Sequence, residues 1–252
     1  MKQHTQLVWG DPPETLELSR NEVHIWGAKL NQRLRELDLL ERTLASSERA
    51  RAERFRFERD RARFIAARGQ LRMILGSYAS VDPCALEFTY GPFGKPSLSP
   101  PFNADALKFN LSHSGELALI AVTRDRDLGV DVEEIRQLDD AEAIAGRFFS
   151  PRENVVLRAL PEAERLEAFF HCWTCKEAYV KATGDGLACP TESFDVSFGR
   201  GEPARLLGVG GNSEEASRWS LTLLTPASGY VGAVAVEGQD WSLTCWQWMQ
   251  KT

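Results

Sequence analysis

The chain has 252 residues, of which 43% are hydrophobic and 26% charged, and its formal net charge is −6 at pH 7. These values are typical of a globular protein with one large or two ordinary domains, and they exclude a disordered or fibrous chain. The acidic balance argues against a dedicated nucleic-acid binder. The longest apolar runs are too short to span a bilayer and no signal-length apolar run opens the chain, so we expect a cytoplasmic protein.

The first half of the chain is expected to mix strands and one long helical region. Alternating apolar residues predict a strand over 21–30, and apolar residues at helical spacing predict a helix over 47–76 that stops at Gly76. A strand running into a Gly/Pro turn is expected over 86–101, and two strands around a tight turn over 107–123. The polar stretch that follows predicts a domain boundary near residue 125.

The second half is expected to repeat this coarse order of elements. A strand is predicted over 128–135, a helix start at the Ser150–Glu153 capping box, and a helix over 162–183 that ends at Gly184. Four strand-like runs then close the chain, at 194–199, 219–226, 230–237 and 241–249. The predicted class is therefore α/β, with domains over 1–125 and 126–252.

Two carboxylates share one face of the predicted strand over 128–135. Asp131 and Glu133 are two residues apart, so both side chains leave the same side of the strand. Neighbouring carboxylates repel, and a divalent cation such as Mg²⁺ would compensate them. The alternative is a strand end where two acids simply meet water, and this pair alone favours that alternative modestly.

The predicted helix over 162–183 carries charged residues on a face that also bears aromatic ones. Trp173, Glu177 and Lys181 are four residues apart and share one face, with Lys176 beside them. A solvated Glu–Lys ion pair is the simplest alternative explanation for Glu177 and Lys181.

The cysteines do not indicate a disulfide framework or a zinc site. Five scattered cysteines are an odd number, and no second CxxC or HxxxH accompanies Cys172 and Cys175. A redox pair needs the N-terminal end of a helix to lower a thiol pKa, whereas these two residues lie inside a predicted helix. We therefore expect buried, unreactive thiols.

The region over 48–68 is locally basic in an acidic protein. It contains eight arginines but only four acidic residues. The arginines are Arg49, Arg51, Arg54, Arg56, Arg59, Arg61, Arg63 and Arg68. Such an excess suggests an anionic ligand such as a phosphate, although most of these arginines are expected to lie on a solvated helix face.

Four segments, in this order and spacing, resemble the Sfp-type 4'-phosphopantetheinyl transferases, most closely the cyanobacterial HetI-like members. The segments are "YGPFGKPSL", "FNLSHSGELALIAV", "LGVDVEEI" and "WTCKEAYVKATGDGL". The resemblance runs from about Val23 to Val236, and GxDxE followed by WxxKEAxxK is its most specific part. It implies two similar α/β halves related by a pseudo-twofold axis, with coenzyme A between them.

The resemblance also implies a reaction and a set of reacting groups. The serine of an apo carrier protein attacks the β-phosphorus of coenzyme A, phosphopantetheine moves to the serine, and 3',5'-ADP leaves. Asp131, Glu133 and Glu177 would hold Mg²⁺, Glu177 would be the base for the serine proton, and Lys181 would bind the pyrophosphate.

Further residues are implied as coenzyme A ligands. His113 and Ser112 would lie near the 3'-phosphate, Arg63 and either Arg49 or Arg51 would bind it, and Lys95 would belong to the adenine pocket. Lys176 is expected to help shape the site. The chain departs from its close relatives at Glu48, where they carry lysine.

Two other functions compete with the transferase. A non-catalytic carrier-protein or nucleotide-binding module would be expected to lack one of Asp131, Glu133, Glu177 or Lys181, and all four are present. A CxxC oxidoreductase would need a reactive Cys172. Having both halves in one chain favours a monomer, and the residues do not specify whether acyl, peptidyl or polyketide carriers are the partners.

Overall fold

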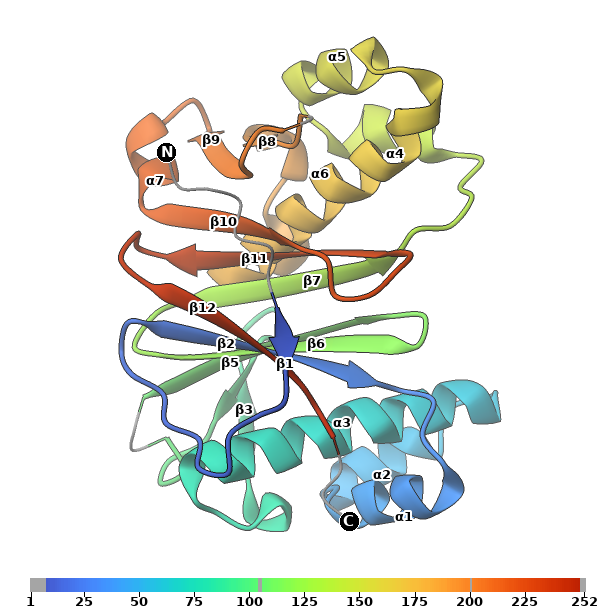
Figure 1. Ribbon diagram of the computed structural model, residues 1–252, viewed down its shortest axis with the longest axis vertical. Helices are drawn as coiled ribbons and strands as arrows, with labels where there is room; N and C mark the ends of the chain where they lie inside the picture. The colour runs from blue at the N-terminus through green and yellow to red at the C-terminus, as the bar shows by residue number, and fades with distance from the viewer. Residues whose placement is uncertain (1–7, 104–105, 200, 250–252) are drawn as a thin grey trace. The chain divides into compact units, whose positions relative to one another are not determined.

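The computed structural model describes residues 8–103, 106–199 and 201–249, and the chain divides into two compact units (Figure 1). The first unit takes the residues up to Thr89, together with Pro96–Asp125 and the residues from Ser242 onwards. The second takes Tyr90–Lys95 and Arg126–Trp241. Each unit combines a sheet with helices, so the predicted α/β class is confirmed.

The first unit is built on a five-stranded sheet in the order β1-β12-β2-β6-β5. Its strands are β1 (Trp9–Gly10), β2 (Glu22–Lys29), β5 (Leu107–Ser114), β6 (Leu117–Arg124) and β12 (Ser242–Gln247). Figure 1 shows its helices together on one side of this sheet: α1 (Leu34–Arg42), α2 (Ser46–Ala52) and α3 (Glu58–Ala79). The core joins apolar residues of α3, such as Ile65 and Leu71, to Trp26 of β2 and Ile120 of β6.

The closing strand belongs to the first unit, which differs from the predicted division at residue 125. β12 pairs in parallel with β2, from Ser242 opposite Glu22 to Gln247 opposite Gly27. Backbone hydrogen bonds from Ser242 N to Asn21 O and from Trp248 N to Gly27 O extend this pairing. Strands far apart in the chain can pair in one sheet. β12 therefore belongs to the first unit, although it directly follows the second unit in the sequence.

The second unit is built on a three-stranded sheet in the order β10-β11-β7. The strands of this sheet are β7 (Leu128–Glu134), β10 (Trp219–Leu224) and β11 (Tyr230–Glu237). A separate two-stranded sheet pairs β8 (Phe194–Ser197) with β9 (Arg205–Val209). The helices of the second unit are α4 (Ala141–Phe148), α5 (Pro151–Ala159), α6 (Glu162–Thr183) and α7 (Ser213–Ser217). α6 contributes to the core of this unit together with β10 and β11, and this packing places α6 against the sheet.

Short elements complete the chain. They are the 3₁₀ turns η1 (Pro83–Ala85), η2 (Gly186–Ala188) and η3 (Thr191–Ser193), and a hairpin of β3 (Phe88–Tyr90) with β4 (Pro96–Leu98). Among the helices of the described ranges, none combines the length and the hydropathy that crossing a bilayer requires.

The predicted helix over 47–76 is wrong in two respects. It is interrupted at Glu53–Phe57, where Phe57 is extended and precedes α3, and the acidic Glu58 and Asp60 then favour a new helix N-terminus. Gly76 does not stop α3; a Cβ there would lie 2.8 Å from Val81 O, so the glycine permits close packing. The helix ends instead at Ser80, whose φ is 53°.

The predicted boundaries of α6 and the start of α5 are confirmed. Ser150 caps α5, with its Oγ accepting from Glu153 N and the Glu153 carboxylate accepting from Ser150 N. Gly184 ends α6 with φ at 78°, a left-handed conformation that glycine adopts without steric cost.

Candidate active site on β7 and α6

A glycine brings α6 directly onto β7. Gly129 shares a face of β7 with Asp131 and Glu133, because alternate residues of a strand point the same way. A Cβ at Gly129 would overlap the backbone of α6 at Ala178 and Ala182, and would lie 2.7 Å from the carbonyl carbon of Lys181. The missing side chain therefore lets the helix backbone lie on the strand beside the two carboxylates.

This packing brings Lys181 into contact with Asp131. Lys181 Nζ lies 2.6 Å from Asp131 Oδ1, and the Asp131 side chain is only 4% exposed. The charge-assisted hydrogen bond compensates a buried carboxylate that would otherwise be costly to desolvate. The sequence-based alternative of a solvated i, i+4 pair between Glu177 and Lys181 does not describe this geometry, because the ammonium group contacts the strand.

Trp173, on the same face of α6 as Glu177 and Lys181, contacts two phenylalanine rings, one of α6 and one of α4. Trp173 stacks on Phe169 with ring centroids 6.1 Å apart and meets Phe148 edge-on at 5.7 Å. These contacts lie one turn before Glu177 and help to fix which face of α6 Glu177 and Lys181 occupy.

Glu177 shares an electrostatic environment with the two strand carboxylates. Burial raises the pKa of the Glu177 carboxyl, and the charges of Asp131 and Glu133 raise it further, whereas Lys181 lowers it. Glu133 also lies 3.7 Å from Arg136, measured from Oε2 to Nη1. The charges of both strand carboxylates therefore act on Glu177. The predicted sharing of one metal ion by these three acids stays a prediction.

The carboxylates do not form a ready metal cluster in the side-chain arrangement of this structure. Within the described ranges, no three His, Cys, Asp or Glu side chains are placed so that they could hold one ion. Asp131 is instead bonded to Lys181.

Lys176 lies on a different side of α6, which corrects its predicted role in binding coenzyme A. Its Nζ donates to the Glu153 carboxylate, 2.7 Å from Oε2, and to Phe194 O at 2.7 Å. The two charged side chains are 2% and 1% exposed. Such a buried pair fixes α6 against α5 and β8, and this burial does not fit a direct contact with a ligand.

Lys95 is bonded to the backbone of the same β7–α6 junction. Its Nζ donates to Leu128 O at 3.1 Å and to Ala182 O at 2.6 Å. The turn that carries it is closed by a hydrogen bond from Gly91 N to Lys95 O. Its predicted place in an adenine pocket stays a prediction.

The other predicted ligands belong to the first unit. Ser112 is buried and His113 exposed on β5, and Arg63 of α3 lies 4.0 Å from Glu116. Arg49 donates to Arg42 O at 3.0 Å, and the Arg51 guanidinium lies 5.2 Å from the centre of the Phe64 ring. Their predicted contacts with the 3'-phosphate stay predictions.

The departure at Glu48 has a structural explanation. Glu48 is buried and accepts hydrogen bonds from Arg68 and from Arg72, the latter at 2.6 Å. Burial alone would raise the pKa of the Glu48 carboxyl, but the two guanidinium groups and the Ala45 backbone hold it below its ordinary value. Glu48 therefore stabilises the packing of α2 on α3.

Cys172 and Cys175 are free, buried thiols. Both are buried, and burial raises the pKa of Cys175 to about 12 and that of Cys172 well above its ordinary value. Because the thiolate is the reactive form, these values disfavour the oxidoreductase interpretation.

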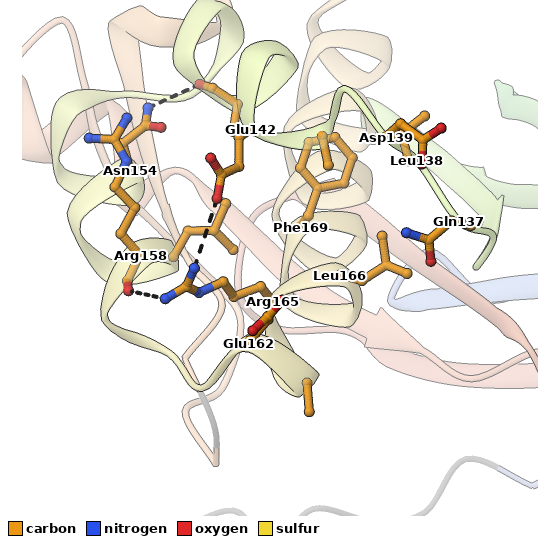
Figure 2. A pocket seen from close by; sticks show the side chains of 14 residues that line it. Gln137, Leu138, Asp139, Glu142, Asn154, Arg158, Glu162, Arg165, Leu166 and Phe169 are labelled. Carbon is orange, nitrogen blue, oxygen red and sulfur yellow. Dashed lines mark hydrogen bonds and ion pairs between the residues drawn. The ribbon is translucent and has the colours of Figure 1, made fainter.

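Sequence reasoning missed a separate pocket of about 580 Å³ among α4, α5 and α6. Figure 2 shows Arg165 reaching Glu142 across this pocket, with Leu166 and Phe169 on its wall. None of the predicted site residues lines it. The capping box identified Glu153 in the sequence, but its ion pair with Lys176, 23 residues away, was not predicted.

Comparison with known proteins identifies relatives of the whole chain. The profile of the 4'-phosphopantetheinyl transferase superfamily matches residues 127–235, and that of the 4'-phosphopantetheinyl transferase N-terminal domain matches residues 30–125. The 4'-phosphopantetheinyl transferase HetI of Nostoc sp. is 45% identical over 98% of this chain and 100% of its own. The 4'-phosphopantetheinyl transferase Sfp of Bacillus subtilis is 31% identical over 61% of this chain and 66% of its own.

Among solved structures, an ACPS–CoA complex of Chronobacterium ammoniagenes is 19% identical. It covers 46% of this chain and 99% of its own, with a TM-score of 0.35. A likeness at that level carries no weight for the geometry described above.

Proposed function

This chain belongs to the 4'-phosphopantetheinyl transferase superfamily and is an enzyme of that class, and from this premise we propose how its own residues act. The proposed reaction moves the 4'-phosphopantetheine group of coenzyme A to a serine hydroxyl of an apo acyl or peptidyl carrier protein. It requires Mg²⁺ and releases 3',5'-ADP. The enzyme thereby activates fatty-acid, polyketide or nonribosomal peptide synthases.

One observation carries the assignment of the site. Lys181 contacts Asp131 at the junction that Gly129 opens, and Glu177 stands one helical turn before Lys181. A cation and several carboxylates at one place suit a reaction on a diphosphate, where charge has to be balanced as a phosphorus–oxygen bond breaks.

Glu177 is the proposed base. The serine oxygen forms a bond to the β-phosphorus, the bond from that phosphorus to the bridging oxygen breaks, and the 3',5'-ADP leaves with the electron pair. The serine proton passes to a carboxylate oxygen of Glu177, directly or through water. Burial and the neighbouring carboxylates raise the pKa of Glu177 in the metal-free protein, and a bound divalent cation would lower it again and weaken Glu177 as a base.

Lys181 is the proposed electrostatic partner of the leaving group. Its ammonium group is already held beside Asp131, so its position is set before the substrate arrives. A fixed positive charge near the diphosphate stabilises the negative charge that grows on the leaving oxygen.

The chemistry of the carboxylates fits a magnesium ion. Asp131, Glu133 and Glu177 supply only oxygen donors, which Mg²⁺ prefers. The pKa of Glu177 is raised by burial and then by the charges of Asp131 and Glu133, and a divalent cation would compensate both effects. These three residues would hold the ion, and when bound it would neutralise and polarise the diphosphate.

The residues of the first unit complete the proposal. His113, Ser112 and Arg63, with Arg49 or Arg51, are proposed to bind the 3'-phosphate. Lys95, which belongs to the second unit, is proposed to lie in the turn that forms the adenine pocket. We further propose a monomer, because both halves of the fold are present in one chain, and a cytoplasmic location.

The test follows the intact mass of several apo carrier proteins incubated with the enzyme, Mg²⁺ and coenzyme A. At least one carrier should gain one phosphopantetheine, and chelation of the metal should prevent it. Glu177→Gln and Asp131→Asn should each abolish transfer while the protein stays folded. Glu167→Gln, on an exposed position of the same helix, is the matched control and should leave transfer unchanged. Normal rates in both active-site variants would reject the site.

A further inference from the structure

The turn between β3 and β4 carries a half-buried lysine, Lys95, whose ammonium group lies at the end of α6. Lys95 Nζ donates to Leu128 O at 3.1 Å and to Ala182 O at 2.6 Å. Leu128 is the first residue of β7, and Ala182 lies in the last turn of α6. One ammonium group therefore ties a strand to a helix.

The two carbonyls stand next to the reacting groups. Leu128 directly precedes Gly129, and Ala182 directly follows Lys181. The close approach of α6 to β7 depends on the absence of a side chain at Gly129. A displacement of either carbonyl would change the separation of Lys181 from Asp131.

The helix end is suited to receive a cation. The last carbonyls of a helix have no partner within it, and positive charge is favourable there because of the helix dipole. Gly184 leaves room for the Lys95 stem, since a Cβ at Gly184 would lie 3.2 Å from Lys95 Cδ. A Cβ at Gly186 would likewise lie 3.0 Å from Phe93 Cβ, so the turn packs closely on the residues after α6.

We propose that Lys95 is a positioning residue, whose ammonium group holds the ends of β7 and α6 together so that Lys181 stays beside Asp131. This inference rests on the proposed function. It gives Lys95 a role in the rate of the chemical step, whereas a direct ligand of coenzyme A would act on the affinity for coenzyme A.

Lys95→Met keeps the aliphatic stem and removes the ammonium group. We expect kcat to fall by about tenfold to a hundredfold, because misplacement of about 1 Å has effects of this size. The KM for coenzyme A should change by less than about threefold, since a loss confined to the transition state leaves ground-state binding in place. Lys29→Met, at an exposed position of β2, is the control and should change neither constant.

A rise in KM with kcat preserved, or no change in either constant, would overturn the inference. If Lys95→Met does not fold, Lys95→Leu, which also lacks a hydrogen-bond donor, replaces it and is judged by the same split of kcat from KM. A purely structural role would lower the melting temperature without lowering kcat of the folded enzyme.

Hydrogen exchange separates a failure of this inference from a failure of the proposed function. Amides of Val180–Gly184 should exchange faster in Lys95→Met than in the wild type, with or without activity. A wild-type enzyme inactive on every carrier would refute the proposed function. Unchanged exchange in the variant would refute the role of Lys95 alone.

Discussion

Replacing Gly129 by alanine tests whether the close approach of α6 to β7 creates the site. The new Cβ would lie 2.7 Å from the carbonyl carbon of Lys181, and ordinary contact begins at 3.4 Å, so α6 must retreat by at least about 0.7 Å. The atoms in its way are helix backbone, which no side-chain rotation can move aside. Overpacking of this kind costs about 3 kcal/mol, at the upper end of the usual range.

The expected consequences are a lower melting temperature and a lower transfer rate. About 3 kcal/mol corresponds to a drop of about 6–12 °C for a chain of this size, measured by thermal unfolding. The transfer rate should fall by about a hundredfold, because Lys181 moves away from Asp131. Gly146→Ala is the matched control: a Cβ there meets nothing within 4 Å, and alanine should stabilise α4 by about 1 kcal/mol. A Gly129→Ala protein with wild-type melting and transfer would refute the packing argument.

Three further predictions concern charge and burial in the second unit. Glu177→Gln should melt at a higher temperature than the wild type in metal-free buffer at pH 7.5 and should lose transfer. Because the pKa of Glu177 is raised in the folded state, ionisation of Glu177 destabilises the fold as pH rises through that pKa. The higher melting temperature of the variant should therefore vanish below about pH 4, where Glu177 is protonated in both states. Equal melting temperatures of variant and wild type at pH 7.5 would contradict this prediction. Glu153→Ala should lower the free energy of unfolding, measured with urea, by about 3–5 kcal/mol, because it leaves Lys176 buried without its partner. Adding Lys176→Met should restore part of this free energy. Losses that simply add in the double variant would count against a buried ion pair. Iodoacetamide at pH 8 should leave Cys172 and Cys175 unlabelled until the protein is denatured, as followed by peptide mass; labelling in the folded state would be incompatible with their burial and raised pKa values.

Those parts of the site that depend on local periodicity were predictable from the sequence. Alternation along a strand placed Asp131 and Glu133 on one face, and helical spacing placed Glu177 and Lys181 on one face of α6. The end of α6 was equally predictable, because Gly184 supplies a left-handed residue directly after the last helical turn.

The features that depend on distant partners were not predictable in this way. Lys176 resembles a site residue in its motif, yet its partner Glu153 is decided by packing against α5. Lys95 donates to carbonyl oxygens 33 and 87 residues away, and every residue carries such an oxygen, so the sequence holds no mark of the contact. The break at Glu53–Phe57 was missed because no glycine or proline marks it in the sequence, although the backbone at Phe57 is extended.

The place of β12 in the sheet of the first unit bears on how the protein folds during synthesis. β12 lies between β1 and β2, and the ribosome makes it only after the whole of the second unit. Until then β2 presents an open edge and β1 lacks its parallel neighbour, so the first unit stays incomplete while the second is already able to form. A protein shortened before Ser242 would leave that edge uncovered for good and invite pairing between chains.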